Sequence, residues 1–269
     1  MNKQSNTYII TYATVLVVVV AAVLSFAAIE LQPRQEANVK IEKMGAILGA
    51  IGKGVSDTAV SDKDRYIEQT FGTYITKTLF VDSLGNATEA TTEEVLGALN
   101  DLPAVFDTKT AMPVFVATLS DDATEYVVPL TGKGLWGAVW GYIALNDDCN
   151  TVAGAVFDHK SETPGLGAEI TTAAFQEQFV GKRIFKDGRF ESIDLLKGKG
   201  SSAGNPYAVD AISGGTLTSN GVKAMLRVCL GDYVPFFEKV QAAAAAAAVA
   251  AADTAACETT TENTEGGAK

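Results

Sequence analysis

The sequence predicts an α+β protein, with one N-terminal transmembrane helix followed by a mostly antiparallel sheet domain with packed helices. A charge-free apolar run near the start predicts the membrane helix. Strand-length runs joined by short links fill the middle of the chain, and such neighbours usually pair in antiparallel fashion. Segments with helical spacing lie before and after these runs, which indicates helices packed on a sheet.

The first element is the apolar run Tyr8–Ile29, which contains no charged residue. Its roughly 22 residues, at about 1.5 Å each, span about 33 Å, enough for a hydrocarbon core. A cleaved signal peptide with Ser25-Phe26-Ala27 as its cleavage site is the alternative, but its apolar region is usually about 7–15 residues long. We therefore predict a cytoplasmic N-terminus over residues 1–7 and an anchor over 8–29. Lys3 ahead of the run places the bulk of the chain outside the cytoplasm, by the positive-inside rule.

The next elements precede the middle of the chain. Gln35–Gly54 has an apolar stripe at helical spacing, which predicts a helix that continues from the anchor. Phe71–Asp82 alternates like a strand and is followed by the turn Leu84-Gly85-Asn86. Thr91 with Glu94 predicts a capping box at the start of a short helix.

The middle of the chain predicts an antiparallel meander. Its links are Asp121-Asp122, Gly132-Lys133-Gly134 and Asn146-Asp147-Asp148. The expected strands are Pro113–Leu119, Tyr126–Leu130, Gly137–Leu145 and Val152–His159. Trp136, Trp140 and Tyr142 share one parity, so we expect them to pack in the core from one strand face.

The last part contains further helices and strands. Ala168–Phe179 is expected to be helical, and Arg183–Ile193 to form two short strands around Asp187-Gly188. Ser219–Leu230 and Tyr233–Val240 are expected to be helices, which ends a domain over 30–240. Residues 241–269 are rich in Ala and then in Thr and Glu, and we expect disorder from Asp253 onwards.

Composition excludes several classes of function. A formal net charge of −11 argues against nucleic-acid binding. Cys149, Cys229 and Cys257 form no CxxC pair, so a metal site within this chain is not expected. His159 is the only histidine, and neither a G-x-G-x-x-G string nor a P-loop is present.

The stretch Asp210–Ser219 has the chemistry of a phosphate site. Gly214 and Gly215 allow a tight turn, hydroxyl residues surround them, and a helix is expected from about Asn220. The N–H groups at a helix N-terminus and its partial positive charge suit a phosphate. An ordinary turn with an N-cap is the alternative.

This stretch resembles the flavinylation motif of FMN-carrying membrane redox subunits, D-x-x-S/T-G-A-T. Asp210, Ser213, Gly214 and Thr216 match the motif, and Gly215 replaces the usual Ala with a smaller residue. The resemblance implies that Thr216 is esterified to the FMN phosphate. Thr218 and Ser219 are nearby hydroxyls that spacing alone does not exclude.

A second string, Glu162–Gly167, reads E-T-P-G-L-G. Pro164 and Gly165 predict a turn, and Gly167 allows a close approach of the backbone. A plain strand-to-helix connection is one reading. In a flavin site, Thr163 and the backbone around Gly165–Gly167 would bind the polar edge of the ring and Leu166 would cover a face.

The two strings together, behind one anchor, resemble the C subunit of the sodium-translocating NADH:quinone oxidoreductase. Gly134-Leu135-Trp136-Gly137 and Thr216–Val222 also match that family, and the likeness runs from the anchor to about Val240. It implies a periplasmic FMN domain on the inner membrane that passes electrons from an iron centre, held by a pair of subunits, to the FMN of the B subunit. NADH and quinone would be handled by other subunits, and a flavin transferase would attach the FMN. Lys197 and Lys199 would place positive charge near the flavin, or else be solvated loop lysines.

Two other readings remain open. The G subunit of the Rnf ferredoxin:NAD oxidoreductase carries FMN through a similar motif, but the long insert between Gly54 and Pro113 favours the C subunit of the sodium-translocating complex. The chain could also be a flavin-free, membrane-anchored binding module.

Overall fold

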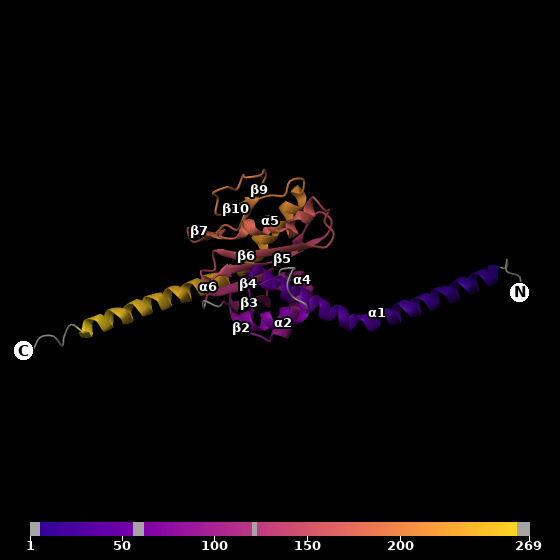
Figure 1. Cartoon of the computed structure of the whole chain (residues 1–269), viewed down its shortest axis with the longest axis horizontal. Coiled ribbons are helices and arrows are strands. Elements are labelled where there is room, and N and C mark those ends of the chain that lie inside the picture. Colours follow the sequence, from indigo (N-terminus) through magenta and orange to yellow (C-terminus); the bar gives the residue numbers. More distant parts are fainter. Residues whose placement is uncertain (1–5, 56–61, 120–122, 263–269) are drawn as a thin grey trace, which may run out of the picture. The chain divides into compact units, whose positions relative to one another are not determined.

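The structure is a computed structural model that describes residues 6–55, 62–119 and 123–262 (Figure 1). Contacts divide the chain into the units Met1–Lys43 and Met44–Lys269. The two are described separately.

The first unit belongs to the long helix α1, Asn6–Ala50. This helix is long and apolar enough to cross a membrane, and none of its most apolar window is buried in the protein. The prediction that the anchor continues as a helix is confirmed, and Pro33 lies inside the helix without ending it. Lys3, on which the predicted orientation depends, lies outside the described residues.

The second unit begins with the end of α1, where Met44, Ile47 and Leu48 are buried. The rest of this unit contains α-helices, 3-10 helices and strands. The helices are α2 Lys63–Tyr74, α3 Thr92–Ala98, α4 Leu102–Thr108, α5 Ala173–Gln176 and α6 Thr216–Glu262, with η1 Leu99–Asp101, η2 Gly167–Thr171 and η3 Glu177–Phe179. The strands are β1 Ile75–Val81, β2 Ala87–Glu89, β3 Met112–Thr118, β4 Thr124–Lys133, β5 Ala138–Asn146, β6 Val152–His159, β7 Phe185–Lys186, β8 Arg189–Phe190, β9 Asp194–Leu196 and β10 Ala208–Asp210.

The main sheet has six strands in the order β2-β1-β3-β4-β5-β6, and every neighbouring pair is antiparallel. The predicted meander from β3 to β6 is therefore confirmed, as is the α+β class. Two smaller two-stranded sheets follow, an antiparallel β7–β8 pair and a parallel β9–β10 pair. The predicted capping box at Thr91 and Glu94 is present.

Both faces of the main sheet are covered. On β4, the ring of Tyr126 packs on Phe236 of α6 with centroids 5.8 Å apart. Gly154 of β6 is in close contact with Ala50 at the end of α1. Gly154 pairs through β5 with Val127, and paired residues share a face, so α6 and the end of α1 cover opposite faces.

The structure corrects several predicted elements. Phe71–Tyr74 belongs to α2 and not to a strand, because Phe71 is buried from a helical face and its ring meets Phe115 edge to face. Ala168–Phe179 is three short helical pieces and not one helix. The two predicted helices after Ser219 are the single helix α6, which starts at Thr216 instead of about Asn220.

We expected disorder from Asp253 onwards, but helix α6 runs to Glu262. Residues 263–269 and the predicted turn Asp121-Asp122 lie outside the described residues.

Candidate functional site

Helix α6 begins directly after a glycine turn. The Gly215 N–H donates to the Ile212 carbonyl at 3.2 Å, and Gly214 has a φ of +76°, which glycine adopts without strain. The Ser219 N–H then donates to the Gly215 carbonyl at 2.8 Å, the first bond of the helix. Gly215 is therefore the N-cap, and Thr216 is the first residue of the helix.

The first turn of α6 offers donors for an anion. Among the residues that the structure describes, the N–H groups of Thr216, Leu217 and Thr218 have no recorded acceptor. Thr216 is half-buried, and its hydroxyl likewise has no recorded partner within the described chain. Free N–H groups and the positive end of the helix dipole suit a phosphate at this position.

The two neighbouring hydroxyls are engaged in the interior. Thr218 is buried, and its Oγ1 donates to Glu162 Oε2 at 2.6 Å. Ser219 is also buried, and its Oγ accepts the Ile212 N–H at 3.1 Å. Of the three hydroxyls that spacing left open, Thr216 is the one that is both accessible and uncommitted.

Glu162 joins three segments of the site. Its side chain is buried, and besides Thr218 it accepts the N–H of Trp136 at 2.9 Å, while its own N–H donates to His159 Nδ1 at 3.1 Å. Burial acts to raise the pKa of Glu162, but the hydrogen bonds from Thr218 and from the N–H groups of Trp136 and Leu135, with His159 nearby, outweigh it and lower the pKa. The carboxylate is therefore ionised at neutral pH.

The loop after Glu162 is a turn of the predicted kind. The Leu166 N–H donates to the Thr163 carbonyl at 3.1 Å, and Gly165 has a φ of +75°. The Gly165 N–H is bound by Glu169 Oε1 at 3.1 Å. Within the described chain, this leaves the Gly167 N–H as the one N–H between Gly165 and Gly167 with no recorded acceptor.

Glycines allow the two strings to touch. A Cβ at Gly214 would lie 2.6 Å from Leu166 Cδ2, and one at Gly215 would lie 3.4 Å from the Gly167 nitrogen. A Cβ at Gly167 would collide with both Glu162 Oε2 and Thr218 Oγ1. The E-T-P-G-L-G string, the Asp210–Ser219 string and the turn at Gly134–Gly137 therefore meet at one place.

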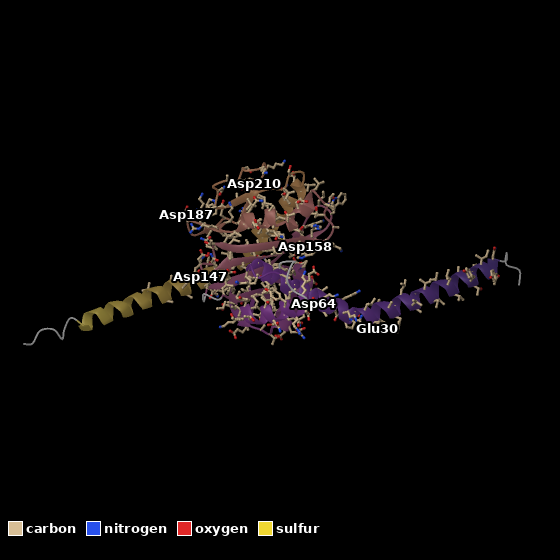
Figure 2. The ribbon with its side chains drawn as sticks, viewed as in Figure 1. Glu30, Asp64, Asp147, Asp158, Asp187 and Asp210 are labelled. Carbon is tan, nitrogen blue, oxygen red and sulfur yellow. The ribbon has the colours of Figure 1, made fainter. Side chains whose placement is uncertain are left out.

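Asp210 supports the site indirectly. Figure 2 labels Asp210 among the side chains of the domain. Its carboxylate accepts the N–H of Gly200, the N–H of Ser202 at 2.9 Å and the hydroxyl of Ser201 at 3.3 Å. These bonds, with the Gly200 N–H foremost, lower its pKa to about 2. Asp210 thus holds the loop that follows Lys197. Among the described residues, no hydrogen bond joins Lys197 to Thr216.

Apolar side chains are exposed around this site. Trp136 is 66% exposed in the turn before β5, so the prediction that it packs in the core is wrong, whereas Tyr142 of β5 is buried. Trp140 is half-buried on β5. Leu135 and Leu217 are exposed as well and were not among the predicted site residues. The sequence held one signal for this exposure, because Leu135 and Trp136 lie between two glycines, which indicate a turn. Strand β5 begins only after this turn, at Ala138.

The arrangement fits a phosphorylated planar ligand. The start of α6 provides N–H donors and a hydroxyl for the phosphate, and exposed Leu135, Trp136, Leu166 and Leu217 provide apolar surface for a ring. Sequence comparison agrees with this fit. A family model described as an FMN-binding domain matches residues 134–231.

Known proteins resemble much more of the chain than that. The C subunit of the Na(+)-translocating NADH-quinone reductase of Vibrio anguillarum is 32% identical over 237 residues, which cover 84% of this chain and 91% of that protein. The C subunit of the same enzyme from Haemophilus ducreyi is 30% identical over 252 residues, covering 90% and 97%. The crystal structure of the C subunit from Parabacteroides distasonis superposes with a TM-score of 0.67 at 37% identity, covering 77% of this chain and 96% of that one.

Proposed function

The chain belongs to the family of C subunits of the Na(+)-translocating NADH-quinone reductases, and from that premise we propose that it holds FMN as a phosphoester on Thr216 and relays electrons within such a complex. The observation that carries this proposal is the position of Thr216. It is the first residue of α6, beside free N–H groups, while the hydroxyls of Thr218 and Ser219 are buried and bonded.

The attachment needs an exposed hydroxyl next to a bound phosphate. The Thr216 oxygen forms the new bond to phosphorus and its proton leaves, while the bond between phosphorus and the leaving group of the flavin donor breaks. The N–H groups of Thr216, Leu217 and Thr218 stabilise the phosphate charge in the donor and in the product. The Glu162 carboxylate contacts this turn of the helix, but it is already bonded to Thr218 and Trp136 and is not available as a base. We therefore assign the catalysis of attachment to a flavin transferase.

The ester holds only one end of FMN, so the ring needs a wall. Leu166, which lies against Gly214, and the exposed pair Leu135 and Trp136 provide it. The Thr163 hydroxyl and the Gly167 N–H are donors for the polar edge of the ring. FMN supplies reversible electron transfer, and the protein orients it and adjusts its potential through these contacts.

In the proposed complex the chain has no substrate site of its own. Electrons come from an iron centre held by other subunits and pass to the FMN of the B subunit, while NADH oxidation, quinone reduction and sodium transport are handled elsewhere in the complex. The apolar run Tyr8–Ile29 anchors the chain in the inner membrane as a single pass, and residues 30–240 form the periplasmic FMN domain. The net charge of −11 fits protein partners better than nucleic acid.

Mass spectrometry of the peptide that contains Thr216 tests the proposal. The wild-type chain, produced together with a flavin transferase, carries the FMN mass on this peptide, and Thr216→Ala removes it. Thr218→Val deletes the neighbouring hydroxyl and keeps that of Thr216, so FMN should remain on the Thr216 peptide, at an occupancy that falls to the extent that the bond between Thr218 and Glu162 positions Thr216. FMN that stays covalently bound in Thr216→Ala, or that is found on Thr218, contradicts the assignment.

In-gel flavin fluorescence of the denatured chain separates this proposal from the alternative of a flavin-free binding module. A fluorescent band supports the relay. A folded chain that stays dark even when the transferase is present supports the module. The alternative role, as the G subunit of an Rnf complex, differs in its electron donor. The sequence relatives support the role in the sodium-translocating reductase.

A further inference from the structure

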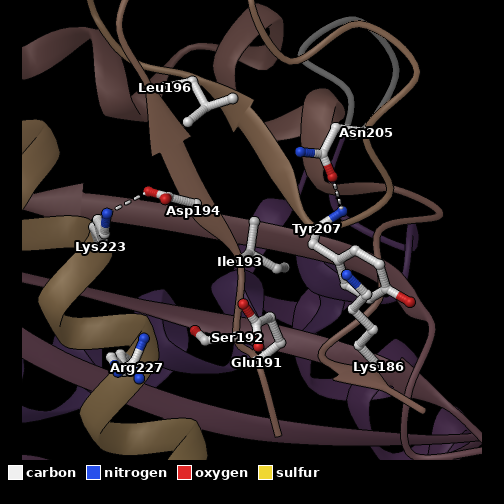
Figure 3. Close-up of a pocket in the computed structure, with 10 residues that line it drawn as sticks. All are labelled: Lys186, Glu191, Ser192, Ile193, Asp194, Leu196, Asn205, Tyr207, Lys223 and Arg227. Atoms are coloured by element: carbon white, nitrogen blue, oxygen red, sulfur yellow. Dashed lines mark hydrogen bonds and ion pairs between the residues drawn. The ribbon is translucent and has the colours of Figure 1, made fainter. Parts of the chain in front are cut away.

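A second site involves α6 further along the helix than Thr216, at Lys223 and Arg227. A pocket of about 240 Å³ is bounded by β7, β9 and the loops around them on one side, and by Lys223 and Arg227 of α6 on the other (Figure 3). Arg227 follows Thr216 by eleven positions in the helix, which is about 16 Å along its axis. The pocket is therefore distinct from the site at Thr216.

Ser192, on the pocket wall, is both strained and unsatisfied. It is only 3% exposed, and its hydroxyl has no hydrogen-bond partner. Its φ of +67° lies in the left-handed region, which serine rarely adopts. The N–H groups of Glu191 and Ser192 both donate to the Ile184 carbonyl, at 2.9 and 3.1 Å, and these bonds hold the backbone in this conformation.

Such a residue indicates a ligand for two reasons. Buried hydroxyls almost always have a partner, and a backbone held in a rarely used conformation is found most often at functional sites. Figure 3 shows the Ser192 hydroxyl pointing toward the α6 side of the pocket, where Arg227 lies. The missing partner of this hydroxyl therefore belongs inside the pocket.

The charges of the pocket favour an anion. Lys223 is paired with Asp194 at 2.6 Å, so these two neutralise each other. Lys186 and Arg227 remain, with Glu191 as the opposing acid, and among the described residues neither cation has a recorded ion pair. A local excess of positive charge contrasts with the net charge of −11 of the whole chain.

The walls set the size and orientation of the ligand. Lys186 Nζ lies 5.8 Å from the centre of the Tyr207 ring, which holds the ammonium group over an aromatic face. A volume of about 240 Å³ lies below the roughly 300–1,000 Å³ of sites for drug-sized ligands, which favours a small ligand.

We propose that this pocket binds a small oxyanion, a carboxylate or a phosphate group, through Arg227, Lys186 and the Ser192 hydroxyl. The Arg227 guanidinium matches two oxygens of such a group, and Ser192 donates to one of them. The site is independent of flavin attachment, since none of these three residues takes part in the site at Thr216.

Thermal unfolding of the full-length chain in detergent, carrying its covalent FMN, measures this binding. Inorganic phosphate and succinate are titrated separately at constant ionic strength against chloride, which shows which oxyanion is preferred. Half-saturation below about 1 mM, with a Tm increase of roughly 2–6 °C at ten times that concentration, is the expected result. Covalent FMN occupies the start of α6, so the phosphate signal cannot arise there.

Variants assign the signal to the pocket. Arg227→Gln and Ser192→Ala each weaken half-saturation at least fivefold, whereas Lys77→Gln on β1, which removes a cation paired with Glu89 at 3.2 Å, leaves it unchanged. Ser192→Gly serves as a second variant, because it removes the hydroxyl and also relieves the backbone strain, so weaker binding in a more stable protein supports the proposal. The proposal is overturned if neither anion exceeds chloride below 1 mM, or if Arg227→Gln binds as tightly as the wild type.

Discussion

The Thr218 hydroxyl donates a 2.6 Å hydrogen bond to the Glu162 carboxylate across 56 positions of sequence, and both residues are buried. The bond ties the first turn of α6 to the loop Thr163–Gly167. Because Thr218 lies two positions after Thr216, the same bond sets where the Thr216 hydroxyl is presented. The acid of one string therefore helps to position the proposed attachment residue of the other.

A double-mutant cycle measures this coupling. We expect Glu162→Gln and Thr218→Val to be less destabilising together than the sum of the single changes, with an interaction energy of about 0.5–3 kcal/mol, because each removes one end of the same buried bond. Denaturant unfolding of the four proteins gives the value. Additivity within about 0.3 kcal/mol would show that the two side chains are energetically independent.

Gly167 is required for the approach of Glu162 to Thr218. Gly167→Ala places a methyl group against both oxygens of that bond, so we expect a loss of about 1–3 kcal/mol in the free energy of unfolding. Gly72→Ala in α2 is the matched control. A Cβ there meets nothing within 4 Å, so helix propensity predicts a gain of about 0.5–1 kcal/mol. Equal effects of the two changes would contradict the close packing at Gly167.

Leu166 covers the proposed flavin and contributes little to the core, since it is 42% exposed. Leu166→Ala should keep covalent FMN but shift its redox potential or its visible spectrum, because the ring loses an apolar neighbour. Spectroelectrochemistry of the purified chain measures both. Leu84→Ala, on the turn after β1, is the control for an exposed leucine. A native potential and spectrum in Leu166→Ala would mean that this loop is only a connection.

Asp210 should hold its loop in place down to low pH. Its folded pKa of about 2 lies below the ordinary value of 3.8, so its contribution to stability is complete above about pH 4 and is lost as the pH falls through 2. The amide NMR shifts of Gly200 and Ser202 report this titration. Asp210→Asn should show altered shifts already at pH 7. A midpoint near 4 in the wild type would mean that the three hydrogen bonds do not stabilise the carboxylate.

The predicted topology rests on the apolar run Tyr8–Ile29 and on Lys3 ahead of it. Protease added to intact spheroplasts should digest the domain from residue 30 onwards, because the positive end of the chain stays in the cytoplasm. Inverted vesicles should protect it. The opposite pattern would reverse the orientation.

Local patterns in the sequence identified much of this protein. An uninterrupted apolar run, alternating strands with short links, and a capping box each depend on neighbours a few positions apart, and α1, the meander β3–β6 and the box at Thr91 follow from them. The two glycine-rich strings also carried a resemblance to one family, with which the relatives agree. Thr216, Leu166 and the loop around Gly165 were all named from those strings.

Other features depend on contacts between distant segments, and only the tertiary structure decided them. Phe71 belongs to a segment that alternates like a strand. In the structure it lies in helix α2, and its buried ring packs on Phe115. Trp136 is a large apolar residue of the kind expected in a core. It is nevertheless exposed, in a turn whose backbone N–H is bound by Glu162. The burial of Thr218 and Ser219, which leaves Thr216 accessible, and the unsatisfied hydroxyl of Ser192 have the same origin. A local pattern states what a residue is able to do, whereas its exposure and its partners depend on the chain that folds against it.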